Sequence, residues 1–160
     1  MTLKEKQHFL TYVDIFGRCK KRDIRQMAKA CMERSYRSGQ ALCRQGQRGV
    51  AMFVVTKGSV RVEEELDDGR RVTITVLSSG AAVGEMAMID GAERTASVVA
   101  ETEVDALVLT CWDFKAMLRQ RPVVALDILA VVVERFRQTA GELRRVCPPP
   151  DGEIRDSSLL

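Results

Sequence analysis

The stretch GAAVGEMAMIDGAERTASVV, residues 80–99, is the most informative part of this 160-residue chain. From Glu85 onward its small and apolar residues predict a short helical turn. The backbone N–H groups at the start of a helix have no intrahelical partner and bind phosphate for that reason. Glycine at position 84 permits both a tight turn and the close approach of a ligand to the backbone. The stretch therefore predicts a place where a phosphate meets the main chain.

Arg94 follows Glu85 by nine residues and supplies a planar, permanently charged group that matches phosphate oxygens. Thr95 adds a hydroxyl donor beside it, and the small residues Ala87 and Ala96 leave room. Because a carboxylate repels a bare phosphate, Glu85 must face a donor such as a ribose hydroxyl. The residues alone leave open a second interpretation, in which Glu85 and Arg94 form a structural salt bridge.

The distribution of charge makes Arg94 conspicuous. Residues 51–110 carry five basic and eleven acidic side chains, whereas residues 1–50 carry twelve basic and four acidic ones. The basic first third could attract an anionic partner or form a solvated helical face. Only eight aromatic residues are present and no basic stretch interleaves with them, which argues against a surface that stacks single-stranded nucleic acid.

Hydrophobic periodicity predicts helices, then a β-rich centre, then helices again. Residues 3–34 are predicted to be helical, with Gly17 separating two segments. Short β-type runs between regularly spaced glycines indicate a sandwich or barrel. The clearest hairpin is 60–77, because its Asp-Gly pair favours a tight turn. A short helix is predicted over 113–119 and a long one from Pro122 to about Val146, ended by the prolines at 148–150.

The long helix also predicts self-association. Its apolar residues recur at alternating spacings of three and four, a heptad pattern, at Leu126, Leu129, Val133, Phe136, Ala140 and Leu143. A helix that is apolar on several faces needs more than one covering surface. We expect one face to pack on its own β-domain and the heptad face to pack on a second copy. Packing of the whole helix within one chain is the alternative.

Composition excludes several classes of protein. The longest apolar run, Ile128 to Val133, is six residues, far short of the roughly 20 that cross a bilayer, so no membrane segment is expected. The N-terminus shows no apolar core of a secretory signal. Five cysteines without CxxC spacing predict reduced thiols in a cytoplasmic protein. The single histidine, His8, argues against a histidine-rich metal site, so no metal or cofactor is expected.

The run GEMAMIDGAERTASV resembles the phosphate-binding cassette of the cyclic nucleotide-binding domain family. That family includes the bacterial catabolite activators, the regulatory subunits of protein kinase A and cyclic nucleotide-gated channels. The resemblance extends over about residues 9–146, with Gln45-Gly46 and Gly58 where the family places them. It implies an α+β, mainly β fold: a double-stranded β-helix (jelly-roll) barrel flanked by N-terminal helices and a long C-terminal helix.

The resemblance also implies roles for individual residues. Glu85 would accept a hydrogen bond from the ribose 2′-hydroxyl, and Arg94 would pair with the cyclic phosphate. The remaining ligand-binding residues are expected to be the cassette positions Gly84, Met86, Ala87, Thr95 and Ala96, the apolar walls Val72, Ile74 and Val83, and Thr139 of the long helix near the purine. The ligand is expected to be cAMP, and Thr95 is of the type seen where cGMP is accepted.

Together these expectations give one hypothesis for the domain organisation and function of the chain. Residues 1–147 would form a cyclic nucleotide-binding domain, with N-terminal helices over 1–35, a barrel over 36–111 with the cassette at 83–97, C-terminal helices over 112–147, and a flexible tail over 148–160. We expect a bacterial, stand-alone sensor, not an enzyme and without a DNA-binding module. It would be a homodimer through helix 122–146 that signals to a protein partner the sequence does not identify. The alternative is a nucleotide-independent dimerisation or protein-docking module of the same fold.

Overall fold

The protein is described from a computed structural model, which describes residues 1–146. The tail predicted over 148–160 and the prolines predicted to end the long helix lie outside the described residues. The helices and strands, in chain order, are α1 (Leu3–Thr11), the 3-10 helix η1 (Asp14–Phe16), α2 (Lys21–Ala30), β1 (Met32–Tyr36), β2 (Ala41–Cys43), β3 (Ala51–Lys57), β4 (Ser59–Glu65), β5 (Arg71–Ser78), β6 (Ala82–Val83), α3 (Glu85–Asp90), β7 (Ser97–Ala100), β8 (Val104–Thr110), α4 (Cys111–Gln120) and α5 (Pro122–Val146).

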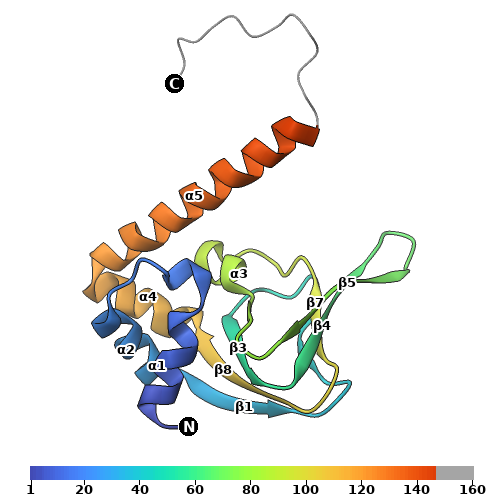
Figure 1. Cartoon of the computed structure of the whole chain (residues 1–160). Coiled ribbons are helices and arrows are strands. Elements are labelled where there is room, and N and C mark those ends of the chain that lie inside the picture. Colours follow the sequence, from blue (N-terminus) through green and yellow to red (C-terminus); the bar gives the residue numbers. More distant parts are fainter. Residues whose placement is uncertain (147–160) are drawn as a thin grey trace, which may run out of the picture.

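Within residues 1–146 the strands form two antiparallel four-stranded sheets, in the orders β1-β8-β3-β6 and β2-β7-β4-β5. The sheets face each other as a flattened barrel, seen in the lower half of Figure 1, that no ladder closes. The mainly β barrel predicted between two sets of helices is therefore confirmed as the fold class.

Strands β3 and β8 are buried on both faces because they separate two apolar cores. On β3, Met52 and Val54 point to a core shared with the helices, whereas Phe53 and Val55 point into the barrel. On β8, Leu107 and Leu109 join the helical core while alternate residues join the barrel core. The period of two along a strand produces this division. One sheet thus fixes the helical layer to the barrel that holds the pocket.

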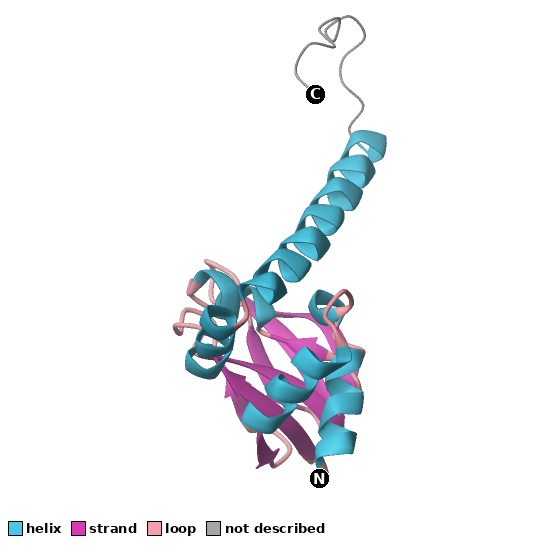
Figure 2. Cartoon of the chain, turned by 90° about the vertical axis from the view of Figure 1, so that its left-hand side faces the viewer, coloured by secondary structure: helices cyan, strands magenta, loops and turns pink. Residues whose placement is uncertain are grey.

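The helices gather on the outer side of the β3–β8 sheet (Figure 2). α1 and α2 pack against each other, α2 also packs on α4, and α5 contacts both α4 and η1 before leaving the body. Thr110 caps α4 by accepting a hydrogen bond from the backbone N–H of Asp113 at 3.1 Å. None of the described helices has the length and apolar character needed to cross a bilayer.

Most predicted elements are found, with one correction. The predicted hairpin is the β4–β5 pair, with Gly69 at φ +81° in its turn, and the long helix is α5. The helix predicted to continue to residue 34 is wrong, since α2 ends at Ala30 and residues Met32–Tyr36 form β1. Strand β1 pairs with the distant β8, and this ladder outweighs the local preference for helix.

Candidate functional site

The cassette begins at a glycine whose conformation is required. Gly84 is the N-cap of α3 at φ +83°, a region that L-residues rarely adopt. A Cβ at this position would lie 1.9 Å from the Arg94 Nη1 atom. Gly84 therefore lets the main chain turn into α3 and at the same time makes room for the arginine.

Arg94 is a buried cation without a carboxylate partner among the described residues. Its side chain is 7% exposed. Nη1 donates to the Gly84 carbonyl at 3.0 Å, Nη2 donates to the Ala51 carbonyl, and Nε has no hydrogen-bond partner. The Cζ atom lies 5.8 Å from the centre of the Phe53 ring. Because burying an uncompensated charge is costly, this guanidinium favours an anion beside it. The structural salt bridge with Glu85 that the sequence left open is absent from the described ion pairs.

The loop between α3 and β7 is held in place by main-chain hydrogen bonds. Arg94 donates its N–H to the Gln47 carbonyl at 2.8 Å, and its own carbonyl accepts from Gly46 at 2.9 Å. Asp90 Oδ1 accepts from the Ala92 N–H at 2.9 Å. Gly49 packs directly on Ala87, where an added Cβ would approach within 2.2 Å. These contacts fix Arg94 relative to α3.

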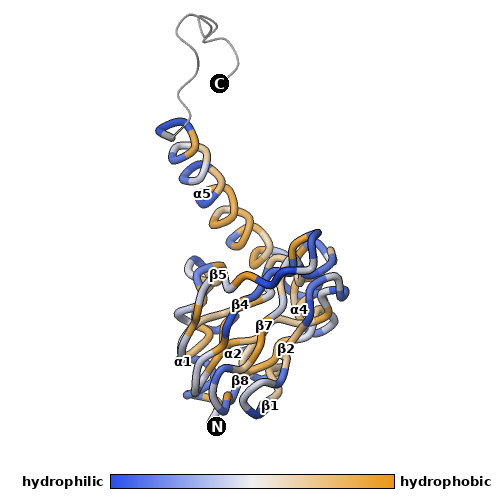
Figure 3. The backbone as a smooth tube through the Cα atoms, turned by 90° about the vertical axis from the view of Figure 1, so that its right-hand side faces the viewer, coloured by the Kyte–Doolittle hydropathy of each residue, from blue (hydrophilic) through white to orange (hydrophobic). Residues whose placement is uncertain are grey.

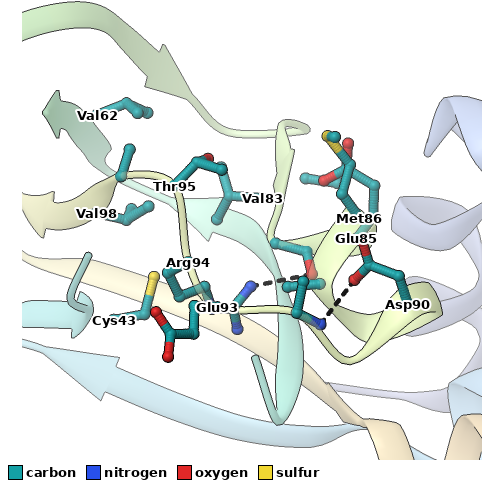
Figure 4. A pocket seen from close by; sticks show the side chains of 15 residues that line it. Cys43, Val62, Val83, Glu85, Met86, Asp90, Glu93, Arg94, Thr95 and Val98 are labelled. Atoms are coloured by element: carbon teal, nitrogen blue, oxygen red, sulfur yellow. Dashed lines mark hydrogen bonds between the residues drawn. The ribbon is translucent and has the colours of Figure 1, made fainter. Parts of the chain in front are cut away.

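Together these segments enclose a cavity of about 220 Å³. In Figure 4, Glu85 and Met86 project from α3 on one side, Arg94 and Thr95 come from the facing loop, and valines form the wall. The lining residues are Cys43, Val62, Ala82, Val83, Gly84, Glu85, Met86, Ala87, Asp90, Ala92, Glu93, Arg94, Thr95, Ala96 and Val98. The cavity combines one buried cation with apolar walls and carboxylates.

Eight of the predicted ligand-binding residues line this cavity: Val83, Gly84, Glu85, Met86, Ala87, Arg94, Thr95 and Ala96. The other three lie elsewhere. Val72 and Ile74 are on β5 with 44% and 55% of their surface exposed, and Thr139 is exposed on α5. In this structure none of the three belongs to the cavity lining.

Sequence reasoning missed several lining residues. Cys43, Val62 and Val98 come from three strands of one sheet, β2, β4 and β7, and carry no local signal of a site. Burial raises the pKa of the Cys43 thiol, and the nearby Arg94 charge opposes that rise. Cys43 therefore contributes an uncharged, apolar wall next to the buried cation.

Glu85 is connected to the long helix. Arg135 of α5 lies with Nη1 3.8 Å from Glu85 Oε1, and its Nη2 donates to Asp14 Oδ2 of η1 at 3.2 Å. Glu85 has 20% of its side chain exposed and faces both the cavity and a second groove that Arg135 borders. A carboxylate of the cavity thus touches the element that leaves the body.

Comparison with known proteins identifies the family to which the cavity and its cassette belong. Residues 33–121 match the family model of the cyclic nucleotide-binding domain. The chain is 34% identical over 110 residues to a cyclic AMP receptor protein of Thermus thermophilus, covering 69% of this chain and 51% of that protein. It is 35% identical over 119 residues to a cyclic nucleotide-gated potassium channel of Mesorhizobium japonicum, covering 74% and 29% of the two chains.

Solved structures of other proteins have the same fold. The N-terminal domain of a transcriptional regulator from Streptomyces coelicolor A3(2) superimposes with a TM-score of 0.75 at 30% identity, over 82% of this chain and 94% of that one. The catabolite activator protein of Thermus thermophilus gives a TM-score of 0.69 at 29% identity, over 83% and 62%. The chain spans about half the length of the first curated relatives it matches.

Proposed function

Because this chain belongs to the cyclic nucleotide-binding domain family, we propose that it binds a cyclic nucleotide in the cavity between α3 and the Arg94 loop and acts as a sensor. The observation that supports this proposal most directly is the burial of Arg94, which has carbonyl partners but no carboxylate partner among residues 1–146. A cyclic phosphate carries one negative charge and would neutralise this cation.

The remaining roles follow from the chemistry of the cavity lining. Glu85 would accept a hydrogen bond from a ribose hydroxyl, and the first N–H groups of α3 with the Thr95 hydroxyl would complete the contacts to the phosphate. Val83, Val62 and Val98 offer apolar surface to the sugar and base. This is a binding role, like that in the names of the regulator and the channel to which the chain is similar.

We propose cAMP as the preferred ligand and cGMP as a second one. Similarity to a cyclic AMP receptor supports the first, and similarity to a cGMP-dependent protein kinase of Caenorhabditis elegans, at 34% identity over 104 residues, supports the second. Thr95 places a hydroxyl next to Arg94, where the hydroxyl oxygen would accept a hydrogen bond from the amino group of guanine.

Calorimetric titration with cAMP and cGMP tests the proposal. Arg94→Ala should weaken binding at least about a hundredfold, because hydrogen bonds to a charged group and its ion pair are lost together. Arg61→Ala is a matched control, since Arg61 lies on β4 outside the cavity lining and pairs with Glu63. Heat of binding that is unaffected by Arg94→Ala would contradict the assignment. A well-folded chain that binds neither nucleotide would favour the alternative of a nucleotide-independent docking module.

The sensor role requires an output element, and we propose α5 for it. Arg135 of this helix forms an ion pair with Glu85. A ligand that hydrogen-bonds to the Glu85 carboxylate therefore competes with Arg135 and weakens this contact of α5. The heptad residues Leu126, Leu129, Phe136 and Leu143 are exposed and border or continue an open groove along α5. We propose that a second copy of the chain covers this face and that the signal passes to a protein partner through α5.

A further inference from the structure

Asp23 is a carboxylate with no exposed surface, and the proposed binding of a nucleotide does not use it. It lies on the inner side of α2, beside Ile24 and Met27, which belong to the helical core. Its Oδ1 lies 2.5 Å from Nε of Arg121 and 3.8 Å from Nε of Arg22. Among the described residues no group donates a hydrogen bond of ordinary geometry to either Asp23 oxygen.

Arg121 is the single residue between α4 and α5. Its backbone N–H donates to the Met117 carbonyl at 2.9 Å, and its carbonyl accepts from Val124 at 3.0 Å, so it closes one helix and opens the next. Its backbone, at φ −138° and ψ +74°, is not helical, and Pro122 prevents one continuous helix through this point. The chain therefore changes direction between α4 and α5 at Arg121.

A buried ion pair is a poor means of adding stability. The cost of removing both charges from water offsets their attraction, and well-packed apolar residues in the same place are often as stable. What the pair does provide is a directed contact between α2 and the junction of α4 with α5. Neither Asp23 nor Arg121 lines the cavity.

We infer that the Asp23–Arg121 pair is a positioning contact: it holds α5 in the orientation that brings Arg135 to Glu85, and thereby sets nucleotide affinity from outside the cavity. The effect on affinity rests on the proposed function; the effect on the position of α5 does not. In this orientation the Glu85 carboxylate faces a guanidinium, and a ribose hydroxyl must compete for it. Releasing α5 frees Glu85, so the affinity for the nucleotide rises.

The test uses the full chain and two variants. Asp23→Leu with Arg121→Met replaces the ion pair by an apolar pair and should keep the unfolding temperature close to that of the wild type. Asp23→Asn removes only the charge. Both should bind cAMP about fivefold more tightly or better in calorimetric titration. Arg22→Met is the matched control, because the Arg22 side chain is 64% exposed and its Nε lies 3.8 Å from Asp23 Oδ1, beyond hydrogen-bond distance, so the affinity of this variant should be unchanged.

A second measurement reports on α5 directly. Spin labels carried by non-cysteine side chains at the exposed positions Thr73 and Gln138 give the distance between β5 and α5 without nucleotide. The double variant should shift or broaden that distance, and Arg22→Met should not. Distances and affinities equal to those of the wild type would overturn the inference. If the wild type binds neither nucleotide, the proposed function fails, and the distance measurement alone decides whether the pair positions α5.

Discussion

At the scale of single residues, Gly84 and Gly91 bracket α3 with nearly the same backbone, φ +83° and φ +74°. Their surroundings differ, because a Cβ on Gly84 would meet Arg94 whereas a Cβ on Gly91 would meet no atom within 4 Å. Conformational strain can therefore be separated from displacement of the arginine.

Gly84→Ala should lose about as much nucleotide affinity as Arg94→Ala, while Gly91→Ala should bind like the wild type. Each substitution should also cost about 1–2 kcal/mol of unfolding free energy, since alanine is strained at positive φ. Titration calorimetry and urea unfolding measure the two effects. Equal affinities of the two alanine variants would mean that Arg94 does not need the space beside Gly84.

Two buried thiols predict a dependence of stability on alkaline pH. Burial, with Asp127 and Asp23 adding to it, raises the pKa of Cys19 to about 11, and burial raises the pKa of Cys31 to about 12. In the unfolded chain both titrate near 9, the ordinary value. Their protonated forms therefore stabilise the fold fully below pH 9, and this stabilisation is lost as pH rises from 9 through 11 and 12.

Thermal unfolding between pH 8 and pH 11 tests this prediction. Cys19→Ala with Cys31→Ala should lower the unfolding temperature at pH 8, because the substitutions leave small voids, but should flatten its fall above pH 9. A fall as steep as in the wild type would assign the alkaline loss of stability to other groups. Cys111→Ala, at a cysteine that is only partly buried, is the control.

The residues of the cassette could be predicted because they stand in one continuous run, where a turn, a cation and small residues are read together. Arg135 could not, because it contacts Glu85 from fifty residues away and its surroundings in the sequence resemble any charged helix face. Val72 and Ile74 were expected as cavity walls from the family resemblance, and both lie exposed on β5. A register shift in the β4–β5 ladder, between Val62 and Glu63, interrupts the alternation of this hairpin, and the sequence does not reveal it.

At the scale of elements, one side chain of α5, Arg135, makes a charged contact with both α3 and η1. Arg135→Gln removes the cation from Glu85 and from Asp14, so α3 no longer has a charged link to α5. We expect the affinity for cAMP to rise about fivefold, with little change in stability because both ion pairs are partly exposed.

Two control variants locate the effect within that element. Arg137→Gln changes the same kind of side chain on the same helix, bordering the other groove, and should leave affinity unchanged. Asp14→Asn breaks only the contact with η1, at a side chain that is 81% exposed. If Asp14→Asn reproduced the whole effect of Arg135→Gln, the Glu85 contact would not be what controls binding.

Element boundaries show where local pattern is sufficient. α4 and α5 were predicted close to their observed limits because Pro122 and the apolar spacing act within a few residues. The end of α2 was not, because residues Met32–Tyr36 become a strand only through their partners on β8, more than sixty residues later in the chain. Long-range pairing of this kind leaves no mark in the local sequence.

At the scale of the whole molecule, the exposed heptad face of α5 predicts a dimer. Phe136 is 73% exposed and Leu129 55%, and Figure 3 shows apolar residues recurring along the part of α5 that leaves the body. Leu129→Lys with Phe136→Lys should reduce the molar mass measured by light scattering from that of a dimer to that of a monomer, because each lysine would bury a charge in the seam.

Glu142→Lys provides the control for that prediction. Glu142 is exposed on the same helix but does not belong to the heptad face, so its substitution should leave the mass unchanged. A wild-type chain that remains a monomer at micromolar concentration would contradict the proposed role of this face. A mass unaffected by the two lysines would move the interface to another surface.

The projection of α5 from the body has a mechanical consequence (Figure 1). Its 25 residues, at about 1.5 Å each, make an arm about 37 Å long whose base is the residue after α4. Rotating such an arm by about 10° at its base displaces its far end by about 6 Å, although the atoms at the pivot move by only a fraction of that. The molecule therefore has the proportions of a lever. A rotation at the base of α5 that is too small to disturb the core displaces the far end of the helix by enough to alter its contact with a neighbouring protein.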